Sequence, residues 1–190
     1  MRILFVCHGN ICRSPMAEYV MKDLVRRKHL ETRFEIASAA TSHEEFGSPV
    51  YPPARRKLAE NGIACAGHRA RQMTRTDYDD YDLIVCMDQR NIRNALQITD
   101  GDPEHKIVLL LDYAGRPGEE VADPWYTGDF DTTWDDVVSG CEGISTVPDL
   151  NTYSPPAFVL SGTKYSISTT GFSFRCDARM LGRPVAGVPC

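Results

Sequence analysis

The chain opens with a short apolar run followed by a segment with helical periodicity. Arg2 to Val6 is rich in β-branched and apolar residues, which predicts a buried strand that ends in a turn at Cys7. After Ser14 and Pro15, apolar residues recur on one helical face: Met16, Ala17, Val20, Met21, Leu24 and Val25. Ser14 is a favourable N-cap and Pro15 a favourable first helical residue. The pattern predicts a strand, a tight loop and a helix.

The same alternation continues along the chain with lower contrast. Further strands are predicted at Phe34 to Ala37, Leu83 to Met87 and Ile107 to Leu111, and further helices at Ala54 to Asn61, 89 to 97 and Asp131 to Cys141. Strands that alternate with helices favour an α/β fold, an open parallel sheet with helices on both faces. Ligands of such sheets bind beyond the carboxyl ends of the strands, where Cys7 lies.

Composition changes after Gly143, which divides the chain into residues 1–143 and residues 144–190. The second part is rich in Ser, Thr, Pro and Gly, and Pro148 stops any helix there. We expect residues 144–190 to be a poorly ordered tail or an artefact of the sequence, such as a frameshift. A hairpin around Tyr165 to Phe174 is the alternative, because partial alternation is visible there.

Charge and cysteine content limit the classes of function. A net charge of -5 argues against nonspecific binding of nucleic acid, so a phosphorylated ligand needs a local positive site. The apolar run at the N-terminus is too short for a signal peptide and no stretch approaches the length of a membrane span, so we expect a cytoplasmic protein that does not bind membranes. Seven cysteines at irregular spacing favour free thiols over a disulfide framework.

Residues 7–14, Cys-His-Gly-Asn-Ile-Cys-Arg-Ser, combine the features of an anion-binding loop. A loop between a strand and a helix N-terminus presents backbone N–H groups and a positive helix dipole to one point. Gly9 and Asn10 tolerate left-handed backbone angles, and Arg13 can donate two N–H groups to phosphate oxygens.

The same surroundings activate a cysteine as a nucleophile. A helix N-terminus and a nearby arginine favour the thiolate form, so we expect Cys7 to attack phosphorus in line and form a covalent cysteinyl-phosphate. Ser14 can donate a hydrogen bond to that sulfur and stabilise it as nucleophile and as leaving group.

Other interpretations of the loop have less support. A nucleotide-binding loop requires Gly-Lys-Ser/Thr, which is missing. Zinc binding by Cys7, His8 and Cys12 lacks a second ligand pair at suitable spacing. Buried, structural cysteines are common for free Cys in general, but the combination of residue types in this loop outweighs that expectation.

Several motifs in order resemble those of a known family. These are Cys-x5-Arg-Ser-Pro-Met-Ala-Glu from Cys7, Tyr51-Pro52-Pro53-Ala54, Asn61-Gly62-Ile63, His68-Arg69-Ala70-Arg71-Gln72, Val85-Cys86-Met87-Asp88 and Asp123-Pro124-Trp125-Tyr126-Thr127-Gly128-Asp129-Phe130. Together they make residues 1–143 similar to low-molecular-weight protein tyrosine phosphatases of bacterial type.

The resemblance implies a four-stranded parallel sheet and an enzyme without metal or organic cofactor. It assigns Cys7 as nucleophile, Arg13 as the clamp on the phosphate and Asp123 as general acid and then base. The phosphate and substrate would be held by His8, Gly9, Asn10, Ile11, Cys12, Ser14, Trp125 and Tyr126. Asn10, Ser14 and His68 would support the loop from behind.

The resemblance also bears on substrate and regulation. Arginine phosphatases of this superfamily tend to carry Thr at the position of Ile11, so Ile11 favours phosphotyrosine in proteins as substrate, with phosphoarginine as the alternative. Cys12 matches a family cysteine that forms a reversible disulfide with the nucleophile, which predicts redox sensitivity. A thiol-dependent arsenate reductase is less favoured, because Cys86 has no close cysteine partner in the sequence. We expect a monomer or a weak dimer.

Overall fold

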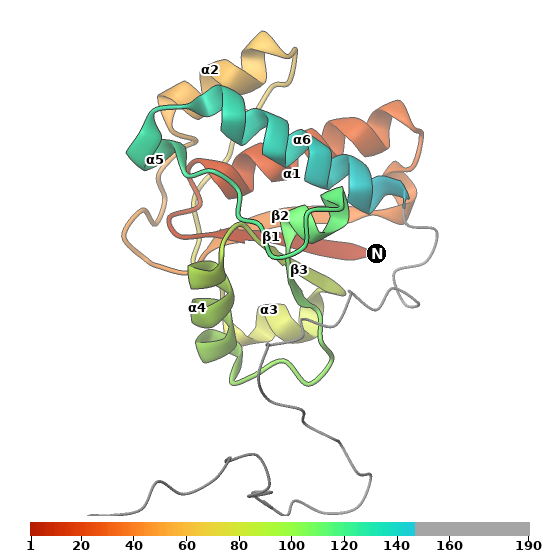
Figure 1. Ribbon diagram of the computed structural model, residues 1–190, viewed down its shortest axis with the longest axis vertical. Coiled ribbons are helices and arrows are strands. Elements are labelled where there is room, and N and C mark those ends of the chain that lie inside the picture. Colours follow the sequence, from red (N-terminus) through yellow and green to blue (C-terminus); the bar gives the residue numbers. More distant parts are fainter. Residues whose placement is uncertain (147–190) are drawn as a thin grey trace, which may run out of the picture. The chain divides into compact units, whose positions relative to one another are not determined.

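The computed structural model describes residues 1–146, so the predictions for the tail beyond Thr146, including the hairpin, lie outside the described residues. Four strands, β1 (Arg2–Cys7), β2 (Glu35–Ala40), β3 (Leu83–Cys86) and β4 (Ile107–Leu109), form one parallel sheet in the order β2-β1-β3-β4. This confirms the predicted four-stranded parallel sheet (Figure 1).

Strand β1 is the centre of the core, and its side chains alternate between two apolar clusters. Ile3 and Phe5 pack in the cluster that contains the apolar residues of α1 (Arg13–Arg27) and α6 (Phe130–Thr146). Leu4 and Val6 pack in the other cluster, with residues of α3 (Arg75–Asp80) and α4 (Gln89–Thr99). Burial on both faces explains why the strand sequence is continuously apolar.

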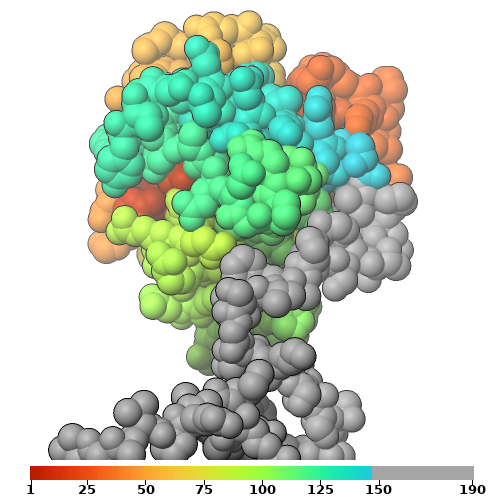
Figure 2. All heavy atoms as spheres, viewed as in Figure 1, coloured from red at the N-terminus to blue at the C-terminus, as the bar shows by residue number. Residues whose placement is uncertain are grey.

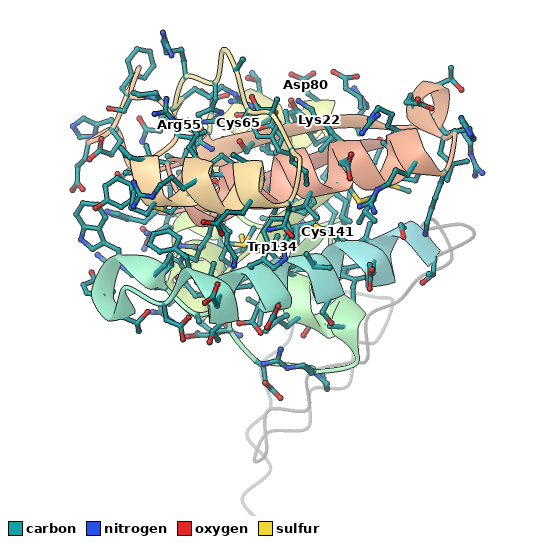
Figure 3. All side chains as sticks on the ribbon, turned by 90° about the horizontal axis from the view of Figure 1, so that it is seen from above. Lys22, Arg55, Cys65, Asp80, Trp134 and Cys141 are labelled. Atoms are coloured by element: carbon teal, nitrogen blue, oxygen red, sulfur yellow. The ribbon has the colours of Figure 1, made fainter. Side chains whose placement is uncertain are left out.

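Helices therefore cover both faces of the sheet, as predicted. Figure 1 shows α1, α2 (Pro52–Glu60) and α6 on one side and α3 and α4 on the other. Figure 3 is viewed from the side of the sheet that α1, α2 and α6 cover, and it shows α1 and α6 side by side. The Cys141 thiol on α6 lies 3.6 Å from the carbonyl oxygen of Ala17 on α1. No helix of residues 1–146 is long and apolar enough to cross a membrane.

The start of α1 differs from the prediction. The helix begins at Arg13, with Cys12 as N-cap residue and no side-chain cap, so Ser14 is not the N-cap and Pro15 is not the first helical residue. Pro15 is tolerated because N–H groups of the first turn have no partner within a helix. The Ser14 hydroxyl contacts the loop instead of capping the helix.

Other boundaries also differ. The predicted strand at Ile107 to Leu111 ends at Leu109 and continues as a 3-10 helix, η2 (Leu110–Ala114). A second short 3-10 helix, η1 (Glu31–Arg33), and the helices α3 and α5 (Pro124–Thr127) were not predicted. They are shorter than the window in which helical periodicity becomes visible.

The last helix, α6, extends past the predicted boundary of residues 1–143 to Thr146. Two glycines allow it to lie directly on η2. A Cβ atom at Gly140 would lie 2.4 Å from Leu110 Cγ, and one at Gly143 would lie 1.9 Å from the carbonyl oxygen of Tyr113. Helix α6 therefore packs against η2 through its glycine surface, and Ile144 remains fully buried beyond it. The division at Gly143 itself stays a prediction.

Candidate active site

Cys7 lies at the carboxyl end of β1, where the loop to α1 begins, and is 3% exposed. The Ser14 hydroxyl oxygen lies 3.1 Å from the Cys7 sulfur, and the backbone N–H of Asn10 donates to the same sulfur at 3.3 Å. Two hydrogen-bonding groups thus converge on one thiol. Such contacts stabilise a thiolate at the base of the loop.

Asn10 holds the loop in shape through all of its polar groups. Its φ of 56° is left-handed, as predicted for this position. The amide nitrogen donates to Ser14 Oγ at 2.9 Å and to Ser38 Oγ at 2.8 Å, and the amide oxygen accepts from the Arg71 backbone N–H at 3.2 Å. The Asn10 carbonyl accepts from His68 Nε2 at 2.8 Å. Asn10 and Ser14 belong to the loop but do not line the pocket, and His68 contacts the loop from the same inner side. Their roles toward substrate stay predictions.

Arg13 is buried and bridges two carboxylates. Its guanidinium makes a 2.7 Å ion pair with Asp88 and another 2.7 Å ion pair with Asp123. Burial alone would lower the pKa of Arg13, but the negative charges of Cys7 and of the two carboxylates raise it above its ordinary value. Arg13 is thus a permanent, oriented cation beside the thiol.

Asp88 was not predicted as a site residue. Its second carboxylate oxygen accepts the Asn91 backbone N–H at 2.6 Å, so Asp88 caps α4 while it fixes Arg13. Its position in the sequence could have identified it as a site residue, because Asp88 follows β3 closely and the carboxyl end of β3 lies beside that of β1. Polar residues at that edge of a parallel sheet are candidates for a site.

Asp123 also has a double role. One carboxylate oxygen accepts the Trp125 backbone N–H at 3.1 Å and caps α5, while the other forms the ion pair with Arg13. The residue before Asp123, Ala122, is hydrogen-bonded to two side chains of helix α6. The Ala122 N–H donates to Asp136 at 3.1 Å, and the Thr133 hydroxyl donates to the Ala122 carbonyl at 2.9 Å. These contacts fix the backbone next to Asp123.

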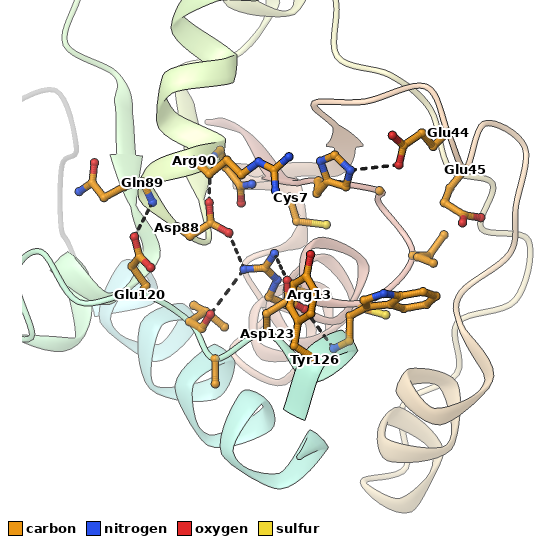
Figure 4. A pocket seen from close by; sticks show the side chains of 18 of the residues that line it. Cys7, Arg13, Glu44, Glu45, Asp88, Gln89, Arg90, Glu120, Asp123 and Tyr126 are labelled. Atoms are coloured by element: carbon orange, nitrogen blue, oxygen red, sulfur yellow. Dashed lines mark hydrogen bonds and ion pairs between the residues drawn. The ribbon is translucent and has the colours of Figure 1, made fainter. Parts of the chain in front are cut away.

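Cys7, Arg13, Asp88 and Asp123 line a pocket of about 660 Å³. Figure 2 shows the red atoms of the N-terminal segment at the bottom of a hollow between the yellow-green and teal parts of the chain. The predicted residues that line the pocket are Cys7, His8, Gly9, Ile11, Cys12, Arg13, Asp123, Trp125 and Tyr126. Figure 4 shows Cys7, Arg13 and Asp123 together at its centre. The structure therefore brings the three predicted catalytic side chains into one pocket.

Two aromatic residues stand at the rim of the pocket. Trp125 is 57% and Tyr126 79% exposed, and both follow Asp123 on α5. The Trp125 ring packs against Tyr51 with the ring centroids 5.4 Å apart. Exposed aromatic faces beside an anion site suit an aromatic ligand.

Cys12 differs from Cys7 in its surroundings. Burial, reinforced by the negative charge of Cys7, raises the pKa of the Cys12 thiol to about 12. Cys12 is therefore held as a neutral thiol at physiological pH. In residues 1–146 no group of three or more potential ligands is placed to hold a metal ion.

Comparisons with known proteins agree with this geometry. A family model described as "Low molecular weight phosphotyrosine protein phosphatase" matches residues 2–150. The low molecular weight protein-tyrosine-phosphatase YfkJ of Bacillus subtilis is 38% identical over 141 residues, which cover 74% of this chain and 90% of that protein.

Solved structures are similar as well. The crystal structure of YfkJ has a TM-score of 0.74 and 37% identity, covering 76% of this chain and 92% of that one. The structure of DARP, a Drosophila arginine phosphatase, has a TM-score of 0.71 and 28% identity, covering 78% and 100%.

Proposed function

Because this chain belongs to the low molecular weight phosphotyrosine protein phosphatase family of hydrolases, we propose that it hydrolyses phosphotyrosine in proteins through a phosphocysteine intermediate on Cys7. The observation that carries the proposal is the convergence of Cys7, Arg13 and Asp123 in one pocket. A thiol, an oriented guanidinium and a carboxyl group supply the nucleophile, the phosphate clamp and the proton donor of this reaction.

In the first step the Cys7 thiolate attacks phosphorus from the side opposite the tyrosyl oxygen. The S–P bond forms, the P–O bond breaks, and Asp123 gives its proton to the departing phenolate oxygen. The loop N–H groups and Arg13 bind the three outer phosphate oxygens. Asp123 can reach the leaving oxygen because it lies 2.7 Å from the guanidinium that would hold the same phosphate.

In the second step water breaks the S–P bond. Asp123, now a carboxylate, takes a proton from the water as its oxygen attacks phosphorus, and the Cys7 thiolate leaves. The hydrogen bonds from Ser14 and from the Asn10 N–H to the sulfur stabilise that leaving group. Inorganic phosphate is released and the enzyme returns to its starting protonation state.

The substrate preference rests on the walls of the pocket. Ile11 and the exposed ring of Trp125 line it, and they offer apolar contact to a phenyl ring. Phosphoarginine is the alternative substrate, favoured by the similarity to a solved arginine phosphatase. An arsenate reductase gains no support, since Cys86 is fully buried within β3.

A paired assay tests this proposal. Peptides of one sequence, with either phosphotyrosine or phosphoarginine at the centre, are offered at equal concentration, and released phosphate is measured. We expect kcat/KM to favour the phosphotyrosine peptide. Faster release from phosphoarginine would make the protein an arginine phosphatase. Release from neither would remove the phosphatase proposal.

We further propose that the protein works in the cytoplasm, a reducing compartment, because all five cysteines of residues 1–146 are free thiols. We also propose that Cys12 controls the activity of Cys7 through a reversible disulfide. Peroxide would oxidise Cys7 to a sulfenic acid, with water as the other product, and Cys12 would then form a disulfide with release of a second water. Oxidation removes the negative charge of Cys7, one of the causes that raise the pKa of Cys12.

A further inference from the structure

The pocket extends beyond the catalytic residues along the first turns of α4. Arg90 and Arg93 line it from this helix, and both side chains are exposed. They stand three residues apart, so they project from the same face of the helix. Within the described part of the chain neither arginine forms an ion pair, whereas Arg13 is bound to two carboxylates.

Acidic side chains line the pocket on both sides of Cys7, with Asp88 and Glu120 on the α4 side. Figure 4 shows Arg90 on one side of Cys7 and Glu44 and Glu45 on the other. Glu44 already accepts a hydrogen bond from His8 at 3.1 Å. On the α4 side, Glu120 accepts the Gln89 backbone N–H at 2.9 Å. Asp88 is already paired with Arg13, and Glu120 can offset the charge of only one of the two exposed arginines, so Arg90 and Arg93 leave the α4 side of the pocket with net positive charge.

A second observation points to a ligand or water on the same side. Asn91, between the two arginines, is fully buried and lines the pocket. Its amide nitrogen and amide oxygen have no hydrogen-bond partner among the described residues. A buried amide without partners costs free energy, so such a group is normally satisfied by ordered water or by a bound group.

We propose that Arg90 and Arg93 form a subsite for a second anionic group of the substrate, a carboxylate or a phosphate next to the phosphotyrosine. This inference rests on the proposed phosphatase function and narrows its substrate class. With the phosphate seated over Cys7, the anionic neighbour lies on the α4 side, because Glu44 and Glu45 repel it on the other. The two arginines thus determine specificity and the direction in which the peptide lies.

The test uses phosphotyrosine peptides that differ only in the neighbours of the tyrosine. The neighbours are glutamine, glutamate or phosphoserine, placed before the tyrosine in one set and after it in another. The variant Arg90→Gln/Arg93→Gln is compared with Arg56→Gln, which makes the same change on exposed α2 outside the pocket. Activity on p-nitrophenyl phosphate serves as the reference that needs no peptide contacts.

We expect the natural protein to prefer a glutamate or phosphoserine peptide over the glutamine peptide by about fourfold in kcat/KM, because each of the two partly exposed ion pairs contributes a factor of about two. The double variant should lose this preference and keep its activity on p-nitrophenyl phosphate, while Arg56→Gln should behave like the natural protein. The preference should also weaken at high salt.

The outcomes separate this inference from the function on which it rests. Equal turnover of all phosphotyrosine peptides by the natural protein, or an unchanged preference in the double variant, overturns the subsite alone. A preference for only the glutamate or only the phosphoserine peptide supports the subsite and shows whether it binds a carboxylate or a phosphate. Absence of turnover on every phosphotyrosine peptide removes the proposed function and the subsite together.

Discussion

Ser14 Oγ lies 3.1 Å from Cys7 Sγ and accepts a hydrogen bond from the Asn10 amide, so its one proton is free to bond either the sulfur or the Ala39 carbonyl at 3.4 Å. A thiolate at Cys7 can only accept, and its charge makes it the stronger acceptor of the two. Asn10 is in turn held by four further groups of the fold. A donor fixed in this way stabilises the thiolate both before attack and when it leaves phosphorus.

Removing this donor should slow turnover. We expect Ser14→Ala to lower kcat on p-nitrophenyl phosphate by about tenfold, the effect of losing one hydrogen bond of about 1.4 kcal/mol to a charged group. Steady-state kinetics at neutral pH measure it. Ser139→Ala, a change outside the pocket on α6, is the control and should leave kcat unaltered. Equal kcat in both variants would show that the Ser14 hydroxyl does not act on the sulfur.

Asp136 positions the backbone beside Asp123, so it should affect proton donation specifically. Asp136→Ala removes the acceptor of the Ala122 N–H and the partner of Arg116. We expect kcat on phenyl phosphate to fall about tenfold more than kcat on p-nitrophenyl phosphate, whose leaving group needs a proton less.

The neighbouring Asp135 is exposed, so Asp135→Ala tests whether any charge change on α6 has this effect. It should preserve the ratio of the two rates. A uniform loss on both substrates in Asp136→Ala would indicate general damage to the fold rather than displacement of Asp123.

Asp77 should stabilise the fold in a pH-dependent way. It accepts two hydrogen bonds from the Arg71 guanidinium, at 3.0 and 2.8 Å, and caps α3 through the Thr74 N–H. Burial alone would raise the pKa of Asp77, but the hydrogen bonds from Arg71 and Thr74 lower it below the ordinary 3.8. The folded state therefore favours the carboxylate form.

We expect Asp77→Asn to lower the free energy of unfolding by about 2 kcal/mol at pH 7. Because the pKa is depressed, this contribution is fully present above pH 3.8 and is lost as the pH falls below it. Urea unfolding of both proteins at several pH values measures the difference. The exposed Asp79→Asn is the control. A difference that does not narrow in acid would argue against the ion pair as its source.

The two cysteines of the loop should differ in reactivity. A thiol whose pKa is raised to about 12 stays protonated at neutral pH, so Cys12 should resist iodoacetamide. Mass spectrometry after brief alkylation at pH 7 should find the label on Cys7, and inorganic phosphate should protect Cys7 by filling the pocket. Equal labelling of Cys7 and Cys12 would contradict the surroundings described for Cys12.

Most of what could be predicted from the sequence came from patterns within short stretches of the chain. The continuous apolar run of β1 and the loop from Cys7 to Ser14 each lie within one short stretch of sequence, so both could be predicted directly. The role of Asp88 could not, because it depends on the pairing of β3 with β1. Ser14 was expected to cap α1, but its hydroxyl is occupied by the thiol and by Asn10.

Tertiary packing explains the remaining differences. Helix α6 reaches Thr146 because Gly143 lets it lie on the Tyr113 carbonyl, a contact that helical periodicity does not reveal. Asp123 and Pro124 begin the short helix α5, which was not predicted, and its cap is the same carboxylate that pairs with Arg13.

Phosphate passes through Cys7 in the proposed reaction, and the phosphocysteine can be trapped by rapid quenching. The protein is mixed with a ³²P-labelled phosphotyrosine peptide, quenched within milliseconds and digested for mass spectrometry. The Asp123→Ala variant is run in parallel, because loss of the base should prolong the intermediate. We predict labelled phosphate on the peptide that contains Cys7, and none in Cys7→Ala, which has no side-chain nucleophile. Turnover with no phosphate on Cys7, or undiminished turnover by Cys7→Ala, would rule out the phosphocysteine intermediate.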